Sequence, residues 1–469
     1  MNTAPRHLSG NYAPVTEERT AHDLPVTGTI PPELNGWYLR NGPNPADAAS
    51  GHWFFGDGMV HGVRLEGGRA VSYRNRWVRT TQLTDGARPY DAQGRRDLTA
   101  GPANTHVVRH AGRTLALVET ALPYELTCDL DTKGPYDFGG RLTTAMTAHP
   151  KTCPATGELH FFGYGMLEPT RLTYHRADAT GELVLSRPIE VPGPTMLHDF
   201  ALTAGHVVFM DLPVVFDVEL ALTGGTMPYG WDDGYGARLG VLRRDDPYGE
   251  VRWFAVDPCY VFHVLNAHDA PDGTIVLHVM RYPELWRRDA DGSTREQRAV
   301  LWKWTVDPAT GAVHEEQCDD RAGEFPRVDD RLTGLAAGHG HVTSGTSLVR
   351  YDLASGAATA HDFGPGRTPG EAAFAPADDT PGGRGWLVTY VYDAAADRSD
   401  LVVLDADDLA APPVATIHLP TRVPFGFHGN WLADRAGQAL PTGVRARRRG
   451  TGGSATTGPG RTRHTHGGA

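Results

Sequence analysis

The sequence predicts an all-β protein with the architecture of a β-propeller. Short apolar runs of strand length recur along the 469 residues, and tight turns separate many of them. Long amphipathic helical patterns are scarce, because 56 glycines and 35 prolines are spread through the chain and interrupt any long helix. A closed β-architecture can use a chain of this length as one domain.

The strands are predicted from apolar runs that are too short for typical helices. Each run has six or seven residues, the length of a strand, and is rich in β-branched and aromatic side chains. The clearest examples are residues 114–119, 159–164, 207–212, 274–280 and 386–392. We expect each of them to be one strand of a blade.

The turns repeat a common theme, in which a glycine follows Asp, Pro, Thr or Ser between two strand-like segments. Glycine supplies the positive φ of a tight hairpin, and Asp and Pro favour the turn before it. The segments are residues 154–158, 177–182, 307–311 and 352–356. Many hairpins in one long chain favour a propeller over a two-sheet sandwich. The repeats are too degenerate to count blades from the sequence alone.

Charge and composition narrow the functional classes. The net charge is −12, which argues against a nucleic-acid partner because phosphates attract basic surfaces. The four cysteines form no CxxC pair, so we expect reduced, partly buried thiols and no thiolate zinc site. The N-terminus lacks an apolar signal core and the chain lacks a run of ~18 apolar residues. The expected location is the cytoplasm.

The chain divides into three segments. Residues 1–27 are a lead-in, residues 28–432 hold the strand pattern, and residues 433–469 form a tail rich in Arg and Gly. The tail carries seven arginines and one aspartate, a net charge of +6. With few apolar groups, it cannot bury enough surface to offset its ordering entropy, so we expect disorder. A solvated charge run is favoured there over an RNA-binding segment.

Four histidines have distinctive surroundings among the 22 in the chain. His149 lies in TAHPK, His198 in MLHDF, His263 in VFHVLNA and His428 in FGFHGN. Gaps of 49, 65 and 165 residues separate them. Local metal motifs place ligands about a turn apart, so these residues would have to come from different blades. Spacing alone does not establish a common site.

Motifs along most of the chain resemble the carotenoid cleavage oxygenase family. They begin with residues 34–45 (LNGWYLRNGPNP), 55–61 (FGDGMVH) and 103–106 (ANTH). They continue with residues 115–124, 147–159, 324–327 (EFPR), Glu371 and 427–429 (FHG). Each motif is weak by itself, but their common order is a strong signal. The resemblance implies a seven-bladed propeller whose metal-site face is capped by short helices and loops.

The resemblance also implies a metal centre with one Fe(2+) per chain. The implied ligands are His149, His198, His263 and His428, and the implied hydrogen-bond acceptors for their outer ring nitrogens are Glu119, Glu324 and Glu371. An acceptor there fixes the tautomer and orientation of a neutral imidazole. Imidazole suits zinc as well as iron, and a closed tetrahedral site would indicate a structural zinc.

The implied reaction is the oxidative cleavage of a carbon–carbon double bond by O₂, which gives two carbonyl products. The substrate would be an apolar conjugated alkene in an apolar tunnel, with no protein nucleophile or general base. Thr105 matches a position near an open coordination site. Phe262, Phe425, Phe427 and Trp431 adjoin ligands and are candidates to line the tunnel, although ordinary core packing also accounts for them. We expect His61 and His106 to be structural.

Alternative functions stay open at this point. A carotenoid or apocarotenoid is the first substrate class, and a stilbene or phenylpropanoid is the second. Stilbene-cleaving members place a lysine just before the first outer glutamate, where this chain has Val118, which disfavours a phenolic substrate. A binding propeller with a structural metal and a non-redox isomerase of retinoid esters are more remote. The sequence leaves open the oligomeric state and any contact of an apolar surface patch with a membrane.

Overall fold

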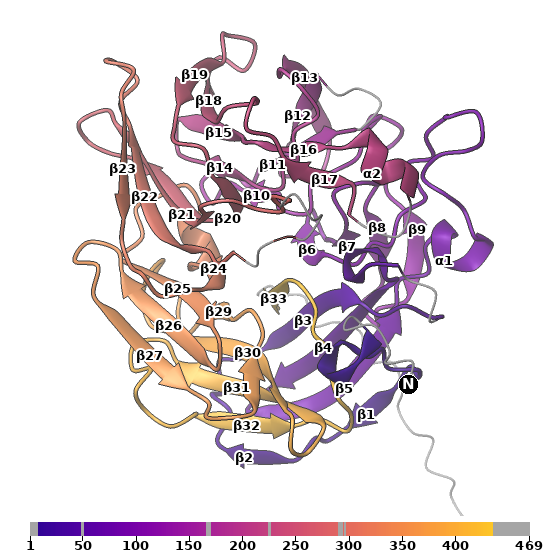
Figure 1. The fold of residues 1–469 in the computed structure, drawn as a ribbon. Helices are drawn as coiled ribbons and strands as arrows, with labels where there is room; N and C mark the ends of the chain where they lie inside the picture. Colours follow the sequence, from indigo (N-terminus) through magenta and orange to yellow (C-terminus); the bar gives the residue numbers. More distant parts are fainter. Residues whose placement is uncertain are drawn as a thin grey trace, which may run out of the picture. The chain divides into compact units, whose positions relative to one another are not determined.

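Seven antiparallel sheets surround a common axis as the blades of a propeller, seen along the axis in Figure 1. The structure is a computed structural model that describes residues 8–434 except 48–50, 166–169, 224–226, 289–293 and 295–296. The chain separates into two units, Met1–Asp434 and Arg435–Ala469, and the second lies outside the described residues. The predicted disorder of residues 435–469 therefore stays a prediction.

Blades 1 to 3 hold the first strands of the chain. Blade 1 contains β1 (Thr20–His22), β3 (Gly36–Pro43), β4 (Gly58–Glu66), β5 (Arg69–Trp77) and β33 (Gly429–Ala433). Blade 2 contains β6 (His106–His110), β7 (Arg113–Leu117), β8 (Tyr124–Leu126) and β9 (Thr132–Pro135). Blade 3 contains β10 (Lys151–Thr152), β11 (Leu159–Tyr164), β12 (Arg171–Ala177) and β13 (Leu183–Glu190).

Blades 4 to 7 complete the ring. Blade 4 contains β14 (Phe200–Leu202), β15 (His206–Asp211), β18 (Arg238–Arg243) and β19 (Arg252–Ala255). Blade 5 contains β20 (Tyr260–Asp269), β21 (Ile275–Tyr282), β22 (Val300–Val306) and β23 (Val313–Gln317). Blade 6 contains β24 (Glu324–Arg327), β25 (His339–Ser344), β26 (Ser347–Asp352) and β27 (Ala358–Asp362). Blade 7 contains β2 (Val26–Gly28), β28 (Arg367–Pro369), β29 (Ala373–Pro376), β30 (Gly385–Asp393), β31 (Arg398–Asp405) and β32 (Ala415–His418).

Two strand pairs join the ends of unit 1 and close the ring. In blade 1 the last strand β33 pairs with β3, with Trp431 opposite Tyr38. In blade 7 the early strand β2 pairs with β32, with Val26 opposite Ile417. Ala433 still pairs with Gly36, so the sheet extends one residue into the segment predicted as the tail. Closure by both ends removes the open edges that an incomplete ring would expose.

The hydrophobic core is distributed between the blades. Among the described residues, seven clusters of buried side chains are found, and each joins two neighbouring blades. Between blades 3 and 4, for example, the rings of Phe162 and Phe200 lie edge to face, 5.5 Å apart. Blade faces are thus apolar on both sides, which explains the short continuous apolar runs of the sequence.

The predicted strands and turns are present. All five apolar runs coincide with strands β7, β11, β15, β21 and β30, with boundaries within two residues, and Glu119 lies two residues beyond the end of β7. The glycines of the four predicted turns, Gly157, Gly181, Gly311 and Gly356, have φ between 70° and 89°. The turn aspartates accept backbone N–H groups, as Asp178 does from Thr180 and Glu182.

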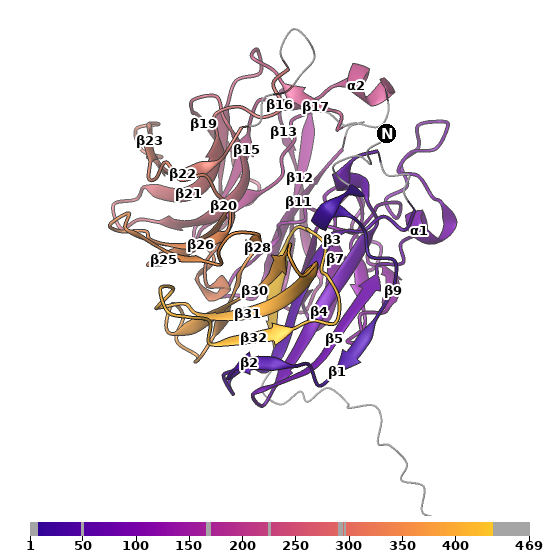
Figure 2. The same cartoon turned by 60° about the horizontal axis from the view of Figure 1, so that its bottom comes forward.

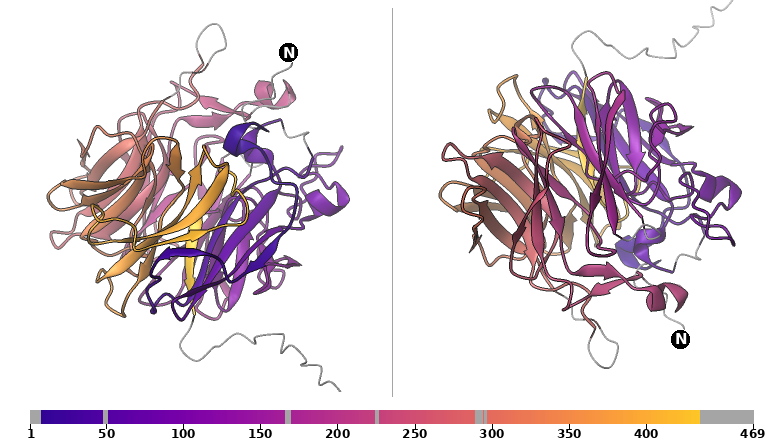
Figure 3. Two further views of the ribbon diagram at one scale, coloured as in Figure 1. Left: turned by 90° about the horizontal axis from the view of Figure 1, so that it is seen from below. Right: turned by 90° about the horizontal axis from the view of Figure 1, so that it is seen from above.

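Short helices and a hairpin gather on one side of the ring, as Figures 2 and 3 show for α2 and the hairpin β16–β17. These elements, called the cap below, are η3 (Trp53–Phe55), α2 (Val218–Thr223), β16 (Val214–Phe216) and β17 (Tyr229–Trp231). The short helix α1 (Thr81–Asp85) lies at the outer rim of the ring (Figure 1). Two further 3₁₀ turns are η2 (Gly10–Tyr12) and η4 (Asp330–Leu332). In α1, the Thr80 hydroxyl caps the first turn by accepting the N–H of Leu83. None of the described helices is long and apolar enough to cross a membrane.

Candidate metal centre

The innermost strands of four blades carry the four predicted histidines to the propeller axis. His149, His198 and His428 lie one or two residues before β10, β14 and β33, and His263 lies within β20. At each of these places a strand starts at the centre of the ring, so its first side chains meet those of the other blades. Residues as far apart as 149 and 428 in sequence thus become neighbours.

The four imidazoles face one another closely. One ring nitrogen from each histidine lies within 4.8 Å of the corresponding nitrogens of the other three. The Nε2 atoms of His149 and His198 are 3.0 Å apart. The ring centroids of His149 and His428 are 4.5 Å apart, and those of His263 and His428 are 4.8 Å apart. The predicted four-histidine cluster is therefore present.

Three carboxylates surround this cluster and accept hydrogen bonds from its outer nitrogens. His198 Nδ1 lies 2.5 Å from Glu119 Oε2, and His263 Nδ1 lies 2.5 Å from Glu324 Oε2. His428 Nδ1 lies 3.0 Å from Glu371 Oε1. Since a carboxylate only accepts, each Nδ1 must carry the proton. The lone pairs of the three Nε2 atoms are then left to point into the cluster.

The three carboxylates differ in their hydrogen-bond partners outside the histidine cluster. Glu371 is 2% exposed, and its Oε2 accepts from the Arg327 guanidinium (3.1 Å) and from the backbone N–H of Gly429 (2.7 Å). The Oε2 of Glu324 also accepts the N–H of Phe325 (2.8 Å), while its buried Oε1 has no hydrogen-bond partner. The Oε1 atom of Glu119, which does not bond His198, accepts a hydrogen bond from the Tyr164 hydroxyl.

Burial keeps two of the four imidazoles uncharged. Desolvation, reinforced by the neighbouring imidazoles, places the pKa values of His149 and His428 well below the ordinary value of 6.5. Burial acts in the same direction on His263, but the Glu324 carboxylate outweighs it and raises the pKa of that ring. Neutral imidazoles are the form that binds metals.

These observations fit a bound divalent metal ion. Converging lone pairs repel one another unless a cation lies between them, and the buried Nε2 of His263 has no hydrogen-bond partner. The three surrounding glutamates carry more charge than the adjoining Arg327 guanidinium, and their negative field attracts a cation. An all-imidazole ligand set suits iron, zinc or copper better than calcium or magnesium.

Aromatic side chains cover the cluster on the side of the cap. The ring of Phe262 lies edge to face against His198, with centroids 5.2 Å apart, and contacts Trp286 at 5.9 Å. Phe427 packs against Trp53 and Phe54 of η3, with centroids 4.7 and 5.3 Å apart. The approach to the metal centre from this side is therefore apolar.

A cavity of about 620 Å³, lined by both apolar and charged side chains, reaches the same cluster from the side of the inner strands. His149, His263 and His428 form part of its wall, together with charged residues such as Lys151 and Arg327. The Lys151 ammonium is paired with the buried Asp199 carboxylate at 2.8 Å. Apolar side chains such as Val264 and Leu265 also line this cavity, so its lining is mixed, whereas the side of the cap is aromatic.

The other predicted residues lie at varying distances from the cluster. Thr105 adjoins it, because its carbonyl accepts the N–H of His428 and its hydroxyl donates to Asn104 (3.0 Å). Phe425 instead packs against Tyr12 and Tyr392, with centroids 4.9 and 6.0 Å apart. Trp431 lines the cavity on the side of the inner strands.

The two histidines expected to be structural are hydrogen-bonded outside the four-histidine group. His61 is buried in blade 1 and its Nδ1 lies 2.9 Å from the Tyr73 hydroxyl. The Nδ1 of His106 bonds the Ala148 carbonyl at 3.0 Å. The four cysteines are free.

Three neighbours of the cluster were missed by sequence reasoning. Arg327 links Glu371 to the Gly429 carbonyl (2.6 Å), although it stands in the quoted motif EFPR. Phe325 has a φ of 57°, rare for a residue with a side chain, and its ring lies 5.7 Å from that of His263. Tyr164 was read only as the last residue of a strand. No local pattern distinguishes these side chains from ordinary core residues.

Comparison with known proteins identifies the family. The family model described as "Retinal pigment epithelial membrane protein" (RPE65) matches residues 12–433. The chain is 41% identical to the carotenoid cleavage oxygenase of Mycobacterium tuberculosis, over 91% of this chain and 97% of that protein. The chain belongs to the carotenoid cleavage oxygenase family.

Solved structures agree with this assignment. Lignostilbene dioxygenase of Pseudomonas brassicacearum superposes with a TM-score of 0.82 at 31% identity, covering 92% of this chain and 99% of that one. The cobalt-substituted apocarotenoid oxygenase of Synechocystis gives a TM-score of 0.81 at 29% identity, covering 90% and 97%. Members of the carotenoid cleavage oxygenase family thus share the seven-bladed propeller, and this chain has the family's four-histidine metal site.

Proposed function

We propose that this protein is an Fe(II)-dependent dioxygenase that cleaves a carbon–carbon double bond of a carotenoid or apocarotenoid into two carbonyl products. The observation that carries the proposal is the cluster of four imidazole nitrogens within 4.8 Å of one another. A redox-active ion is needed because ground-state O₂ does not add readily to an alkene, and no protein side chain supplies that chemistry.

His149, His198, His263 and His428 would hold the iron through Nε2. When bound, Fe(II) supplies the activation of O₂ for its addition across the alkene. Glu119, Glu324 and Glu371 keep three of these rings in the Nδ1–H tautomer and aim their Nε2 atoms inward. Iron is favoured over zinc by the membership in a family of oxygenases, since zinc has no redox chemistry.

The aromatic side of the site would receive the substrate. Phe262 presents a ring surface next to His198, and Phe427, which precedes His428 in the chain, packs against Phe54. An apolar polyene gains free energy by leaving water for such a surface. Thr105 lies on the same axis and would limit the space beside the iron. These side chains exclude water and orient one double bond, which accounts for much of what a protein contributes to such a reaction.

The substrate class is argued from one position and from the relatives. Val118, just before Glu119, is 7% exposed and approaches Gly101 in an apolar setting, so it offers no ammonium group to a phenol. The name of the 41%-identical relative refers to carotenoids, whereas the structural relative named for lignostilbene is 31% identical. Both observations support a carotenoid over a stilbene.

The decisive experiment is aerobic turnover with two substrates in parallel. Iron-loaded protein is incubated under ¹⁸O₂ with a β-apocarotenal and, separately, with resveratrol, and the carbonyl products are identified by mass spectrometry. We expect labelled aldehydes from the apocarotenal. Cleavage of resveratrol alone would assign the stilbene class, and stable iron binding without O₂ consumption would indicate a structural metal in a binding propeller.

A further inference from the structure

Glu119 has a second hydrogen-bond partner in Tyr164. The Tyr164 hydroxyl donates to Oε1 of Glu119 at 3.2 Å, while Oε2 of the same carboxylate lies 2.5 Å from His198 Nδ1. Both oxygens are thus occupied, one by the candidate ligand and one by a neutral phenol. Burial and the adjoining carboxylate raise the pKa of Tyr164 well above its usual range, so the phenol keeps its proton.

This contact crosses three consecutive blades. Glu119 follows β7 of blade 2, Tyr164 ends β11 of blade 3, and His198 precedes β14 of blade 4. Glu119 lies beyond the end of its strand, so no strand pairing fixes its backbone. The carboxylate depends on its own hydrogen bonds for orientation, and a glutamate side chain otherwise has three rotatable torsions.

The corresponding carboxylate on the other side of the cluster is held much more firmly. Glu371 is bound by Arg327 and by a backbone N–H, and its side chain is 2% exposed, whereas the Glu119 side chain is 16% exposed. Among the described residues, Tyr164 is the only side chain besides His198 with a hydrogen bond to Glu119. The loss of this donor would free one oxygen of Glu119.

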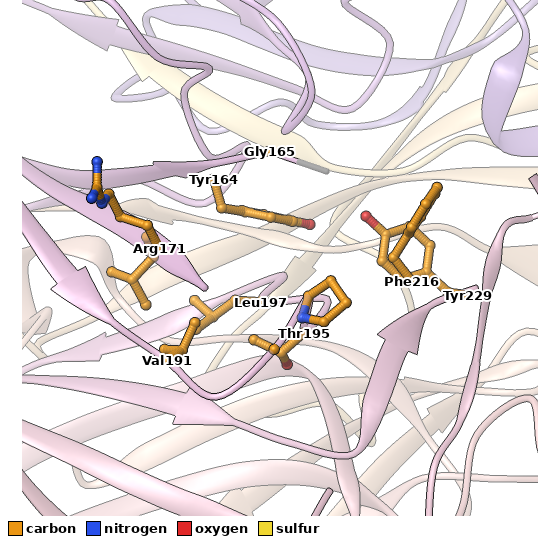
Figure 4. A pocket seen from close by; sticks show the side chains of 11 residues that line it. Tyr164, Gly165, Arg171, Val191, Thr195, Leu197, Phe216 and Tyr229 are labelled. Atoms are coloured by element: carbon orange, nitrogen blue, oxygen red, sulfur yellow. The ribbon is translucent and has the colours of Figure 1, made fainter. Parts of the chain in front are cut away.

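A tyrosine of the cap also lies beside Tyr164. Tyr164 and Tyr229 line a small pocket beside Leu197, and their hydroxyls point toward one another (Figure 4). Tyr229 belongs to β17 of the capping hairpin. The hydroxyl of Tyr164 is therefore enclosed between the cap and Glu119, and its direction is restricted from both sides.

We propose that Tyr164 is a positioning residue of the metal centre, which acts on His198 through Glu119. Its hydroxyl fixes the plane of the carboxylate, and the carboxylate fixes the ring of His198. The inference rests on the proposed function of the four histidines as metal ligands. A merely structural tyrosine would stabilise the fold without a specific effect on the metal.

The test is a double-mutant cycle on cobalt affinity. Metal-free wild type, Tyr164→Phe, Glu119→Ala and the double variant are titrated with Co(II), and binding is followed by the visible absorption of the ion. We expect Tyr164→Phe to weaken binding by about 10-fold, at the low end for partners of metal ligands. In the Glu119→Ala background the same change should have no further effect, because the hydroxyl then has no carboxylate to hold.

Tyr174→Phe is the matched control. Tyr174 lies in the neighbouring strand β12, is buried, and bonds His160 at 2.6 Å instead of a residue of the cluster. It should leave cobalt affinity unchanged. Wild-type affinity in Tyr164→Phe, or an equal loss with and without Glu119, would overturn the inference. Wild-type protein that binds cobalt but cleaves no alkene would count against the proposed function alone.

Discussion

Replacement of Glu324 and of Glu371 by glutamine should lower the free energy of unfolding by different amounts. Glu324 uses only Oε2, which accepts from His263 and from the Phe325 N–H, and its Oε1 has no partner. Glu371 uses both oxygens, Oε1 for His428 and Oε2 for Arg327. Replacement by glutamine keeps one oxygen acceptor and turns the other into an NH₂ donor.

The magnitudes follow from this hydrogen-bond geometry. In Glu324→Gln the amide oxygen can occupy the Oε2 position, and the NH₂ replaces a buried oxygen that already has no partner, so the main loss is charge assistance, about 1 kcal/mol. In Glu371→Gln the NH₂ must face either the Arg327 guanidinium or the His428 Nδ1–H, both of which are donors. A buried donor without an acceptor costs about 1–3 kcal/mol, which adds to the lost charge assistance. We expect Glu371→Gln to be less stable than Glu324→Gln by about 2 kcal/mol.

Urea denaturation of the metal-free proteins measures the difference in unfolding free energy, and metal titration measures the effect of each substitution on metal affinity. Both variants should bind iron or cobalt about 10–100-fold more weakly, because both lower the basicity of a ligand. Equal unfolding free energies for the two variants would refute the assignment of the hydrogen bonds. Wild-type metal affinity in Glu324→Gln would refute its role beside His263.

Further predictions concern the ligands, the loop before β33, pH and the tail. His198→Ala should lower iron content and turnover together, and full iron occupancy by elemental analysis would remove His198 from the site. Gly426→Ala should reduce metal binding and stability, since a Cβ there would lie 2.5 Å from Arg40 Nη1, whereas Gly338→Ala, with nothing within 4 Å, should melt like the wild type. Burial lowers the pKa values of four histidines remote from the cluster from 6.5 to about 3 or 4. Below pH 6.5 the unfolded chain therefore binds more protons than the folded protein. The metal-free protein should be most stable above about pH 6.5 and lose roughly 1.4 kcal/mol per pH unit for each such histidine as the pH falls toward 4. Equal urea midpoints at pH 7 and pH 5 would contradict this. Truncation after Asp434, which pairs with Arg64 at 2.6 Å, should leave iron binding and turnover unchanged.

Local features of the fold were predictable from the sequence, and closure of the ring was not. A hairpin such as residues 177–182 is specified by the few residues that form it, because Asp178 and Gly181 favour the turn directly. The pairing of Tyr38 with Trp431 joins segments at opposite ends of unit 1. No local pattern encodes such a contact, and the number of blades follows only once it has formed.

The residues of the metal centre likewise divide into those identified from the sequence and those seen only in the structure. The four histidines and three glutamates were identified only through resemblance, because gaps of 49, 65 and 165 residues have no recognisable period. Arg327, Phe325 and Tyr164 act through contacts between blades, which appear only in three dimensions. The positive φ of Phe325 in particular has no sequence signal, since glycine is the residue expected there.

The propeller itself explains the irregular gaps. Each blade contributes one side chain near the start of its innermost strand, and around the ring from blade 1 to blade 7 these are His428, Thr105, His149, His198, His263, Glu324 and Glu371. The gap of 165 residues separates His263 of blade 5 from His428 of blade 1. It is long because blades 6 and 7 lie between them and contribute glutamates instead of histidines. Each of these two lies beside a histidine of the adjoining blade, which it holds. His198 has histidine-bearing blades on both sides, so its acceptor, Glu119, must come from beyond the end of β7 and needs the additional support of Tyr164.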